Sequence, residues 1–265
     1  MIKPASFAGS FYPQDKETLK SDVLRYLDLA EEKVKKIKIP HNSSGKNKQL
    51  KALIVPHAGY IYSGEIAGVG YKLLEGSDVE NFIVIGPSHQ EYFRGIACGN
   101  FDGWETPLGQ IKTDNSKTNG IEGIVVNKLA LSREHSVEVQ LPFIQTISPS
   151  SSIVGLVTGD ISDYGIYIKQ LSKPYKKTVF VISSDLSHYQ AFNDAVEMDK
   201  ITISEILEYN QVLHEQACGA DGINILTGIA KNLGWSPVLL DYRNSGDTQG
   251  QKDAVVGYCS IAYFA

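Results

Sequence analysis

The sequence predicts an α/β protein with a central sheet, mainly parallel or mixed, flanked by helices. The first reason is a series of short apolar runs that are rich in β-branched residues and too short to form helices. Their apolarity is continuous rather than alternating, which indicates strands covered on both faces. The second reason is that helix-period patterns fill the gaps between these runs, and such alternation is typical of parallel sheets.

The expected elements follow one another without a dividing linker, so we expect a single domain over residues 1–265. A helical pattern with one apolar stripe runs from about Asp15 to Lys36, and a solvated loop, His41–Lys48, follows it. The expected strands are Ala52–Val55, Phe82–Ile85, Ile153–Val157, Val179–Ile182 and Val238–Leu240, with a closing strand or strand pair at Ala254–Ala265. The expected helices are Gly64–Leu74, Ile161–Leu171, Asp194–Tyr209 and Asp221–Leu233.

Composition excludes several classes of protein. Hydrophobic residues make up 42% of the 265 residues, which is enough for a sizeable core and argues against a disordered chain. The net charge of −5 disfavours a nucleic-acid partner, because such proteins normally present a basic face. We expect no membrane span, since no apolar stretch is long enough, and no secretory signal at the N-terminus. The three cysteines fit the reducing cytoplasm best, although they leave a single disulfide bridge open.

Three of the six histidines follow expected strands. His57 comes after the first strand, His89 after the second, and His188 after the run Val179–Ile182. A single histidine in a loop is most often a surface or hydrogen-bonded residue. Ligands of parallel sheets collect at the carboxyl ends of the strands, however, and imidazole is the commonest metal ligand. The pattern therefore predicts a shared site at this edge of the sheet.

A further cluster of polar residues lies at Glu134–Glu138. His135 and Glu138 are three residues apart, so they would share one face of a helix. The pair could be a ligand set or support one. It could equally be a charged first turn, because acidic side chains suit a helix N-terminus.

Among the cysteines, Cys218 is the one outside an apolar run. It lies beside Gly219 and just before an expected helix, where a lowered thiol pKa would favour the metal-binding thiolate. A buried structural cysteine remains an equal alternative. The sequence has no phosphate-binding loop, nucleophile elbow, HExxH helix or CxxC pair, which excludes the common sites built on those motifs.

Taken together in chain order, six short motifs resemble the Memo family, in a match that extends from residue 6 to the last strand. They are PHAGYIYSG (56–64), GPSH (86–89), WETPLG (104–109), EHSVEVQLPF (134–143), SSDLSHY (183–189) and ACG (217–219). The resemblance implies a fold like the catalytic subunit of class III extradiol dioxygenases, which use non-haem iron held by two histidines and a carboxylate.

The resemblance also implies a set of site residues. In Memo proteins a cysteine takes the place of the carboxylate, so the implied metal ligands are His57, His89 and Cys218. Asp185 and His188 match residues that line the same pocket, with His188 standing where a base acts and Asp185 orienting it. His135, a further pocket histidine, completes the implied catalytic group of His188, Asp185 and His135.

Four residues depart from the family's pattern, namely Phe11, Gln90, Gln140 and Phe143, the last in place of a tyrosine. Phe11 replaces a tryptophan that belongs, in animal members, to a surface that binds a phosphotyrosine peptide. Gln90 and Gln140 replace two histidines, which leaves fewer groups that could face an anion. We therefore expect this protein not to depend on a phosphotyrosine partner.

These observations lead to one hypothesis and two rivals. The hypothesis is a metal-binding redox protein acting on an unknown small molecule or peptide, with iron or copper as the metal and zinc as a further option, because thiolate favours softer ions. The rivals are a peptide- or phosphate-binding module without turnover and a zinc hydrolase. The resemblance further implies a radical-SAM protein as a partner of microbial members.

Overall fold

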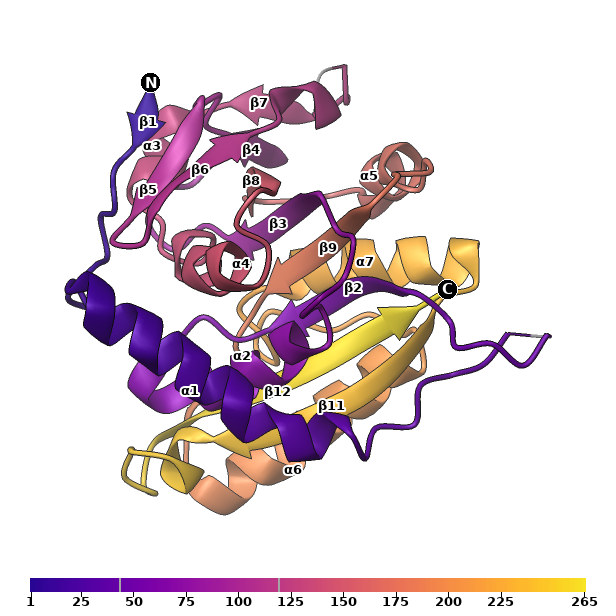
Figure 1. Ribbon diagram of the computed structural model, residues 1–265. Helices are drawn as coiled ribbons and strands as arrows, with labels where there is room; N and C mark the ends of the chain where they lie inside the picture. The colour runs from indigo at the N-terminus through magenta and orange to yellow at the C-terminus, as the bar shows by residue number, and fades with distance from the viewer. Residues whose placement is uncertain (43, 119) are drawn as a thin grey trace.

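The computed structural model describes residues 1–42, 44–118 and 120–265, so Ser43 of the expected loop His41–Lys48 lies outside the described residues. Helices cover both faces of one extensive sheet (Figure 1). The strands are β1 (Ile2–Lys3), β2 (Leu50–Val55), β3 (Asn81–Pro87), β4 (Ile96–Cys98), β5 (Gly103–Thr106), β6 (Gly109–Thr113), β7 (Ile124–Val126), β8 (Ser152–Thr158), β9 (Thr178–Ser183), β10 (His188–Gln190), β11 (Ser236–Asn244) and β12 (Val255–Phe264).

Seven α-helices connect or cover these strands within the described part of the chain. They are α1 (Lys16–Val34), α2 (Tyr60–Lys72), α3 (Lys128–Ser132), α4 (Leu141–Ile147), α5 (Tyr164–Leu171), α6 (Phe192–Leu207) and α7 (Ala220–Leu233). Short 3-10 turns occur at Asn115–Lys117, Glu138–Gln140 and Ser245–Asp247. The expected helices are confirmed with shifts of a few residues at their ends, which is the usual uncertainty of such boundaries.

The centre of the sheet is parallel, as the continuous apolar runs indicate. Strands β8, β3, β9 and β2 are neighbours in that order, and each adjacent pair runs parallel. Antiparallel strands extend the sheet beyond β2, where β12 pairs with β2, β11 and β10. The predicted fold class is therefore confirmed in its mixed form.

Side chains alternate between two apolar cores because successive residues of a strand point to opposite faces. In β2, Leu53 and Val55 belong to the core under α1, α2 and α4, whereas Ala52 and Ile54 belong to the core under α5, α6 and α7. Figure 1 shows these two groups of helices on either side of the sheet. Burial on both faces explains why the central strands are continuously apolar.

The regions that sequence periodicity missed are short or antiparallel. Strands β4 to β7 have three to five residues each, which is too short for a period to be recognised. The expected strand Val238–Leu240 is the middle of β11, which is longer and only partly buried. No helix of the described residues is long and apolar enough to cross a membrane.

The carboxyl ends of the parallel strands position the polar loops. Strand β2 leads into Pro56 and His57, β3 into Ser88 and His89, and β9 into the segment that begins at Ser184. Because these strands are parallel neighbours, their following loops meet at one edge of the sheet. The candidate site lies at this edge.

Candidate metal site

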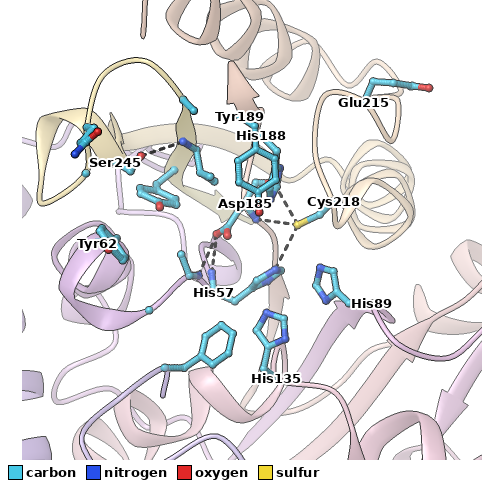
Figure 2. Close-up of a pocket in the computed structure, with 18 of the residues that line it drawn as sticks. His57, Tyr62, His89, His135, Asp185, His188, Tyr189, Glu215, Cys218 and Ser245 are labelled. Atoms are coloured by element: carbon cyan, nitrogen blue, oxygen red, sulfur yellow. Dashed lines mark hydrogen bonds between the residues drawn. The ribbon is translucent and has the colours of Figure 1, made fainter. Parts of the chain in front are cut away.

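A cavity of about 900 Å³ opens at the carboxyl edge of the sheet. Five of the six histidines line it, namely His57, His89, His135, His188 and His214. Figure 2 shows that the predicted residues Asp185 and Cys218 face the same space. The structure thus brings together all six residues that the sequence analysis assigned to the site.

His57 is held rigidly beneath the cavity. Its ring is almost fully buried, and its Nδ1 lies 3.0 Å from the hydroxyl of Ser183. That hydroxyl donates to the carbonyl of Ser136 at 2.6 Å and accepts from the amide of Gln140 at 2.7 Å, so it accepts from His57 as well. Nδ1 therefore carries the proton, and Nε2 offers a lone pair 3.3 Å from Sγ of Cys218.

His89 and His135 are held by one buried carboxylate. Oε1 of Glu134 accepts from Nδ1 of His89 at 2.9 Å and lies 3.2 Å from Nδ1 of His135. The two rings stack with centroids 4.7 Å apart. On the other face of His135, the ring of Phe11 stacks at 4.2 Å, so His135 is fixed between two rings.

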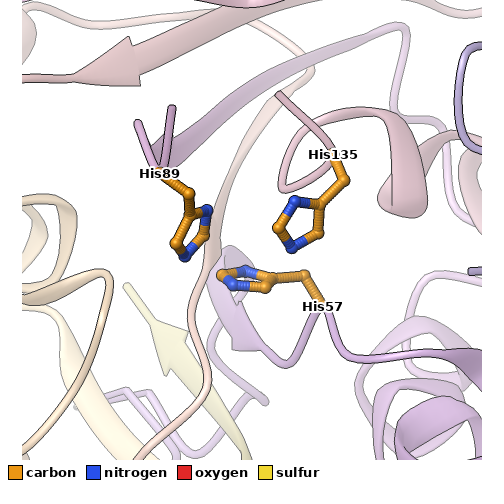
Figure 3. A group of neighbouring side chains, drawn as sticks. All are labelled: His57, His89 and His135. Carbon is orange, nitrogen blue, oxygen red and sulfur yellow. The ribbon is translucent and has the colours of Figure 1, made fainter. Parts of the chain in front are cut away.

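One ring nitrogen from each of His57, His89 and His135 lies within 4.8 Å of the others. Figure 3 shows the three rings turned toward a common space, with the His57 ring nearly perpendicular to the other two. Such a group could hold a metal ion, because neutral imidazole nitrogen is a common ligand of transition metals.

Burial keeps most of these imidazoles neutral. Desolvation lowers the pKa of His57 to about 3 and that of His135 to about 3 as well. Burial would also lower the pKa of His89, but the hydrogen bond and the charge of Glu134 outweigh burial and raise it. Despite its own burial, the pKa of Glu134 falls to about 2, mainly through its hydrogen bond with His89.

Cys218 joins this group from the other side of His57. Its sulfur accepts the backbone N–H of Asp185 at 3.3 Å and lies just before α7 (Figure 2). The expected lowering of its thiol pKa by the helix terminus is wrong, because burial and the nearby Asp185 carboxyl raise that pKa. All three cysteines are free, so the disulfide that the sequence left open is absent from the described chain.

Asp185 and His188 have different roles from the predicted pairing. The Asp185 carboxylate accepts the backbone N–H of His57 at 2.8 Å and that of Ala58 at 3.3 Å, so it fixes the loop after β2. The carbonyl of Leu186, rather than Asp185, orients the His188 ring by accepting from Nδ1 at 2.8 Å. Nδ1 of His188 therefore carries the proton, and Nε2 is the acceptor nitrogen of this ring at the cavity.

Several expectations about neighbouring residues need correction. Gln140 is fully buried beneath the site, where it bonds Tyr71 and Ser183, and neither it nor Gln90 lines the cavity. The inference from sequence that Gln140 changes anion binding at the cavity is therefore wrong. Glu138 does not share a helix face with His135, because a turn separates them and its carboxylate binds Lys3 at 2.5 Å.

Sequence reasoning missed three contributors to the site. His214 and Glu215 line the cavity from a loop that follows no strand, so the strand-end rule could not find them. Their spacing of four and three residues from Cys218 was the available signal. Glu134 belongs to the polar cluster Glu134–Glu138, but its contact with His89 joins residues 45 positions apart and is invisible to local patterns.

The fold and the cavity define an α/β protein whose histidine-rich site could hold a metal ion. The model of the family described as "Memo-like protein" matches residues 3–262, and the chain belongs to this family.

Archaeal relatives agree with this assignment over their whole length. Proteins of Pyrobaculum arsenaticum and Sulfolobus acidocaldarius are 37% and 34% identical to this chain, and each alignment covers 99% of this chain and 99% of the relative. A protein of Nitrosopumilus maritimus is 33% identical, with 99% of this chain and all of the relative covered. Each is named a MEMO1 family protein.

Proposed function

We propose that this protein binds a transition metal through His57, His89 and Cys218 and uses it in a redox reaction on a small molecule. The observation that carries the proposal is the 3.3 Å approach of Cys218 Sγ to His57 Nε2, beside the three-histidine group. Each of these side chains comes from a different segment, and each faces the cavity of about 900 Å³.

The pair of His57 and Cys218 fits such an ion, whereas the group whose ligand atoms all lie within 4.8 Å of one another consists of His57, His89 and His135. Ligands bound at ~2.0–2.3 Å in a tetrahedral arrangement lie roughly 3.5 Å from one another. The nitrogen–sulfur separation of 3.3 Å between His57 and Cys218 matches this spacing. Two neutral imidazoles with one thiolate form a soft set that favours iron, copper or zinc over magnesium or calcium.

A bound ion would reverse the protonation state that burial imposes on the thiol. Burial raises the pKa of Cys218 in the metal-free site, and a coordinated thiol is deprotonated outright. Metal uptake at neutral pH would therefore release a proton. Iron or copper bound there would supply one-electron chemistry.

The remaining residues would act on the substrate. His188 has its acceptor nitrogen Nε2 at the cavity and is suited to accept or return a proton. Asp185 holds the His57 backbone in place, and His135 offers a further nitrogen close to the ligands. Phe11, Tyr62 and Tyr189 provide aromatic surface at the cavity for an organic substrate.

The test is elemental analysis of protein purified without oxygen, for the wild type and for the Cys218→Ser, His57→Ala, His188→Ala and Cys98→Ser variants. Cys98 is a matched control because it lies on β4 and does not line the cavity. We expect about one equivalent of iron or copper in wild type, Cys98→Ser and His188→Ala, and a loss of at least tenfold in the other two.

Three outcomes would contradict parts of the proposal. If the purified protein contained zinc and neither iron nor copper, the result would contradict a redox reaction and favour a hydrolytic one. Full metal content in the Cys218→Ser variant would show that the thiolate is not a ligand and would favour His135 as the third ligand. If the wild-type protein took up none of these metals, the remaining interpretation would be a binding module without turnover.

A further inference from the structure

Glu134 lies at the centre of the site without facing the cavity. Its side chain is 1% exposed, and both carboxylate oxygens are engaged. Oε2 accepts the backbone N–H of His89 at 2.6 Å. Oε1 accepts the backbone N–H of Ser136 at 2.9 Å and Nδ1 of His89 at 2.9 Å, and it lies 3.2 Å from Nδ1 of His135.

The hydrogen-bond partners of this carboxylate are two backbone N–H groups and Nδ1 of His89. An ionised carboxylate can only accept, so Nδ1 of His89, which is hydrogen-bonded to it, must carry the proton when that ring is neutral. Nδ1 of His135 lies 3.2 Å from the same oxygen, and a proton on that nitrogen faces the negative charge more favourably than a lone pair does. The protons then lie on Nδ1 in both rings, and both Nε2 atoms keep free lone pairs. The stacked arrangement of the rings turns both of them toward the His57 side, as Figure 3 shows.

We propose that Glu134 is a positioning residue that fixes the same tautomer in His89 and His135, so that Nε2 of His89 is prepared for the proposed metal ion and Nε2 of His135 faces the same space. The inference rests on the proposed metal site for its purpose, but the tautomers themselves are a property of the metal-free protein. Carboxylates that hold ligating histidines in this way typically change metal affinity 10–100-fold when they are removed.

Two substitutions separate the acceptor from the charge. Glu134→Leu removes the acceptor while keeping an unbranched Cβ and a similar size. Glu134→Gln keeps one oxygen acceptor and loses the charge. The amide oxygen should take the place of Oε1, beside Nδ1 of His89 and the backbone N–H of Ser136, rather than the place of Oε2, which accepts only the backbone N–H of His89. Glu91→Gln is the control, because Glu91 pairs with exposed Arg133 and not with a ring.

The first experiment reads the tautomers by long-range proton–nitrogen NMR of the six histidine rings in metal-free protein at about pH 8.5, where ordinary histidines are neutral. His89→Ala and His135→Ala assign the two signals. We expect both rings to be protonated on Nδ1 in wild type, Glu91→Gln and Glu134→Gln. Glu134→Leu should show at least one of the two rings protonated on Nε2.

The second experiment titrates zinc into the same proteins. Glu134→Leu should bind zinc 10–100-fold more weakly than wild type, and Glu134→Gln should fall between them. Wild-type rings protonated on Nε2 would overturn the inference, and this result does not depend on how the variants fold. Unchanged tautomers together with zinc affinity within twofold of wild type in Glu134→Leu would overturn it as well.

The two experiments also separate this inference from the proposed function. Wild-type rings protonated on Nδ1 in a protein that binds no zinc, iron or copper would support the role of Glu134 and contradict the metal site. Metal binding by a protein whose two rings are protonated on Nε2 would support the metal site and contradict the role of Glu134.

Discussion

Two buried glutamates four residues apart bind two different sets of residues. Glu134 accepts from Nδ1 of His89 and from backbone N–H groups and lies beside Nδ1 of His135, so its partners include residues that line the cavity. Glu138 accepts from Lys3 at 2.5 Å and from the Tyr12 hydroxyl at 2.6 Å, so its environment is the N-terminal segment. The same chemical group organises a candidate reaction site in one case and anchors a chain terminus in the other.

The difference teaches that burial of a carboxylate does not identify a functional site; the nature of its donors does. The donors of Glu134 include groups that could also bind a metal. The donors of Glu138 are an ammonium, a phenol and two backbone N–H groups, all of which belong to residues 3–12 and none of which reaches the cavity. Four predictions test this contrast.

The largest effect is expected from Glu138→Leu. It leaves the Lys3 ammonium fully buried without a partner, which should lower the free energy of unfolding by about 3–5 kcal/mol. The double variant Lys3→Met/Glu138→Leu should recover part of this loss, because it removes the unpaired charge. Urea unfolding measures both, and a double variant no more stable than Glu138→Leu would refute the anchoring role of the ion pair.

Glu134→Gln should show its effect as a dependence on pH. The folded-state pKa of Glu134 is about 2, below its ordinary value of 4.5, so ionisation stabilises the fold above about pH 4.5 and this gain is lost as pH falls toward 2. The gain is about 3 kcal/mol at neutral pH. Urea unfolding of metal-free protein should show the difference between wild type and Glu134→Gln shrinking from about pH 7 to about pH 3. A constant difference would contradict this assignment.

Phe11→Ala tests the contact between the two regions, because the segment anchored by Glu138 carries the ring that stacks on His135 at 4.2 Å. We expect stability to fall by about 1 kcal/mol. Phe11→Trp, which restores the residue of the family pattern, should preserve the stack. Thermal unfolding of the three proteins decides, and an Ala variant as stable as wild type would show that the stack contributes nothing.

The smallest effect is expected for the binding of a phosphotyrosine peptide to the cavity. No lysine or arginine lines the cavity in the described part of the chain, and burial keeps His57 and His135 uncharged. Calorimetric titration with a phosphotyrosine peptide and its unphosphorylated twin should therefore show no phosphate-dependent affinity. Low-micromolar, phosphate-dependent binding of about −8 kcal/mol would contradict this expectation.

The parts of the site that sequence could predict are those that strand order fixes. His57 and His89 each follow a buried parallel strand, and His188 lies five residues beyond a third, so sheet geometry alone brings them to one edge. Cys218 differs from the other two cysteines because it lies outside an apolar run. Local patterning was sufficient in these cases because the relevant structure is regular.

The remaining parts depend on contacts between irregular segments. Glu134 and Glu138 look alike in sequence, and their roles are decided by partners 45 and 135 positions away. The sequence places Gln140 among groups that could face an anion, yet its amide bonds buried groups beneath His57. Periodicity describes which face a residue occupies within an element, and it contains no information on which distant loop packs against that face.

The place of β12 in the sheet has a consequence for the biosynthesis of the protein. This last strand along the chain pairs with β2, which ends at Val55, whereas β12 begins at Val255. At a translation rate of about 5–20 residues per second, the intervening stretch takes roughly 10–40 s to synthesise. Throughout that time β2 presents an apolar edge without its antiparallel neighbour, a surface on which nascent chains aggregate. Chaperone demand should therefore be highest before β12 emerges, and any chain that stops short of this strand should be degraded or aggregate.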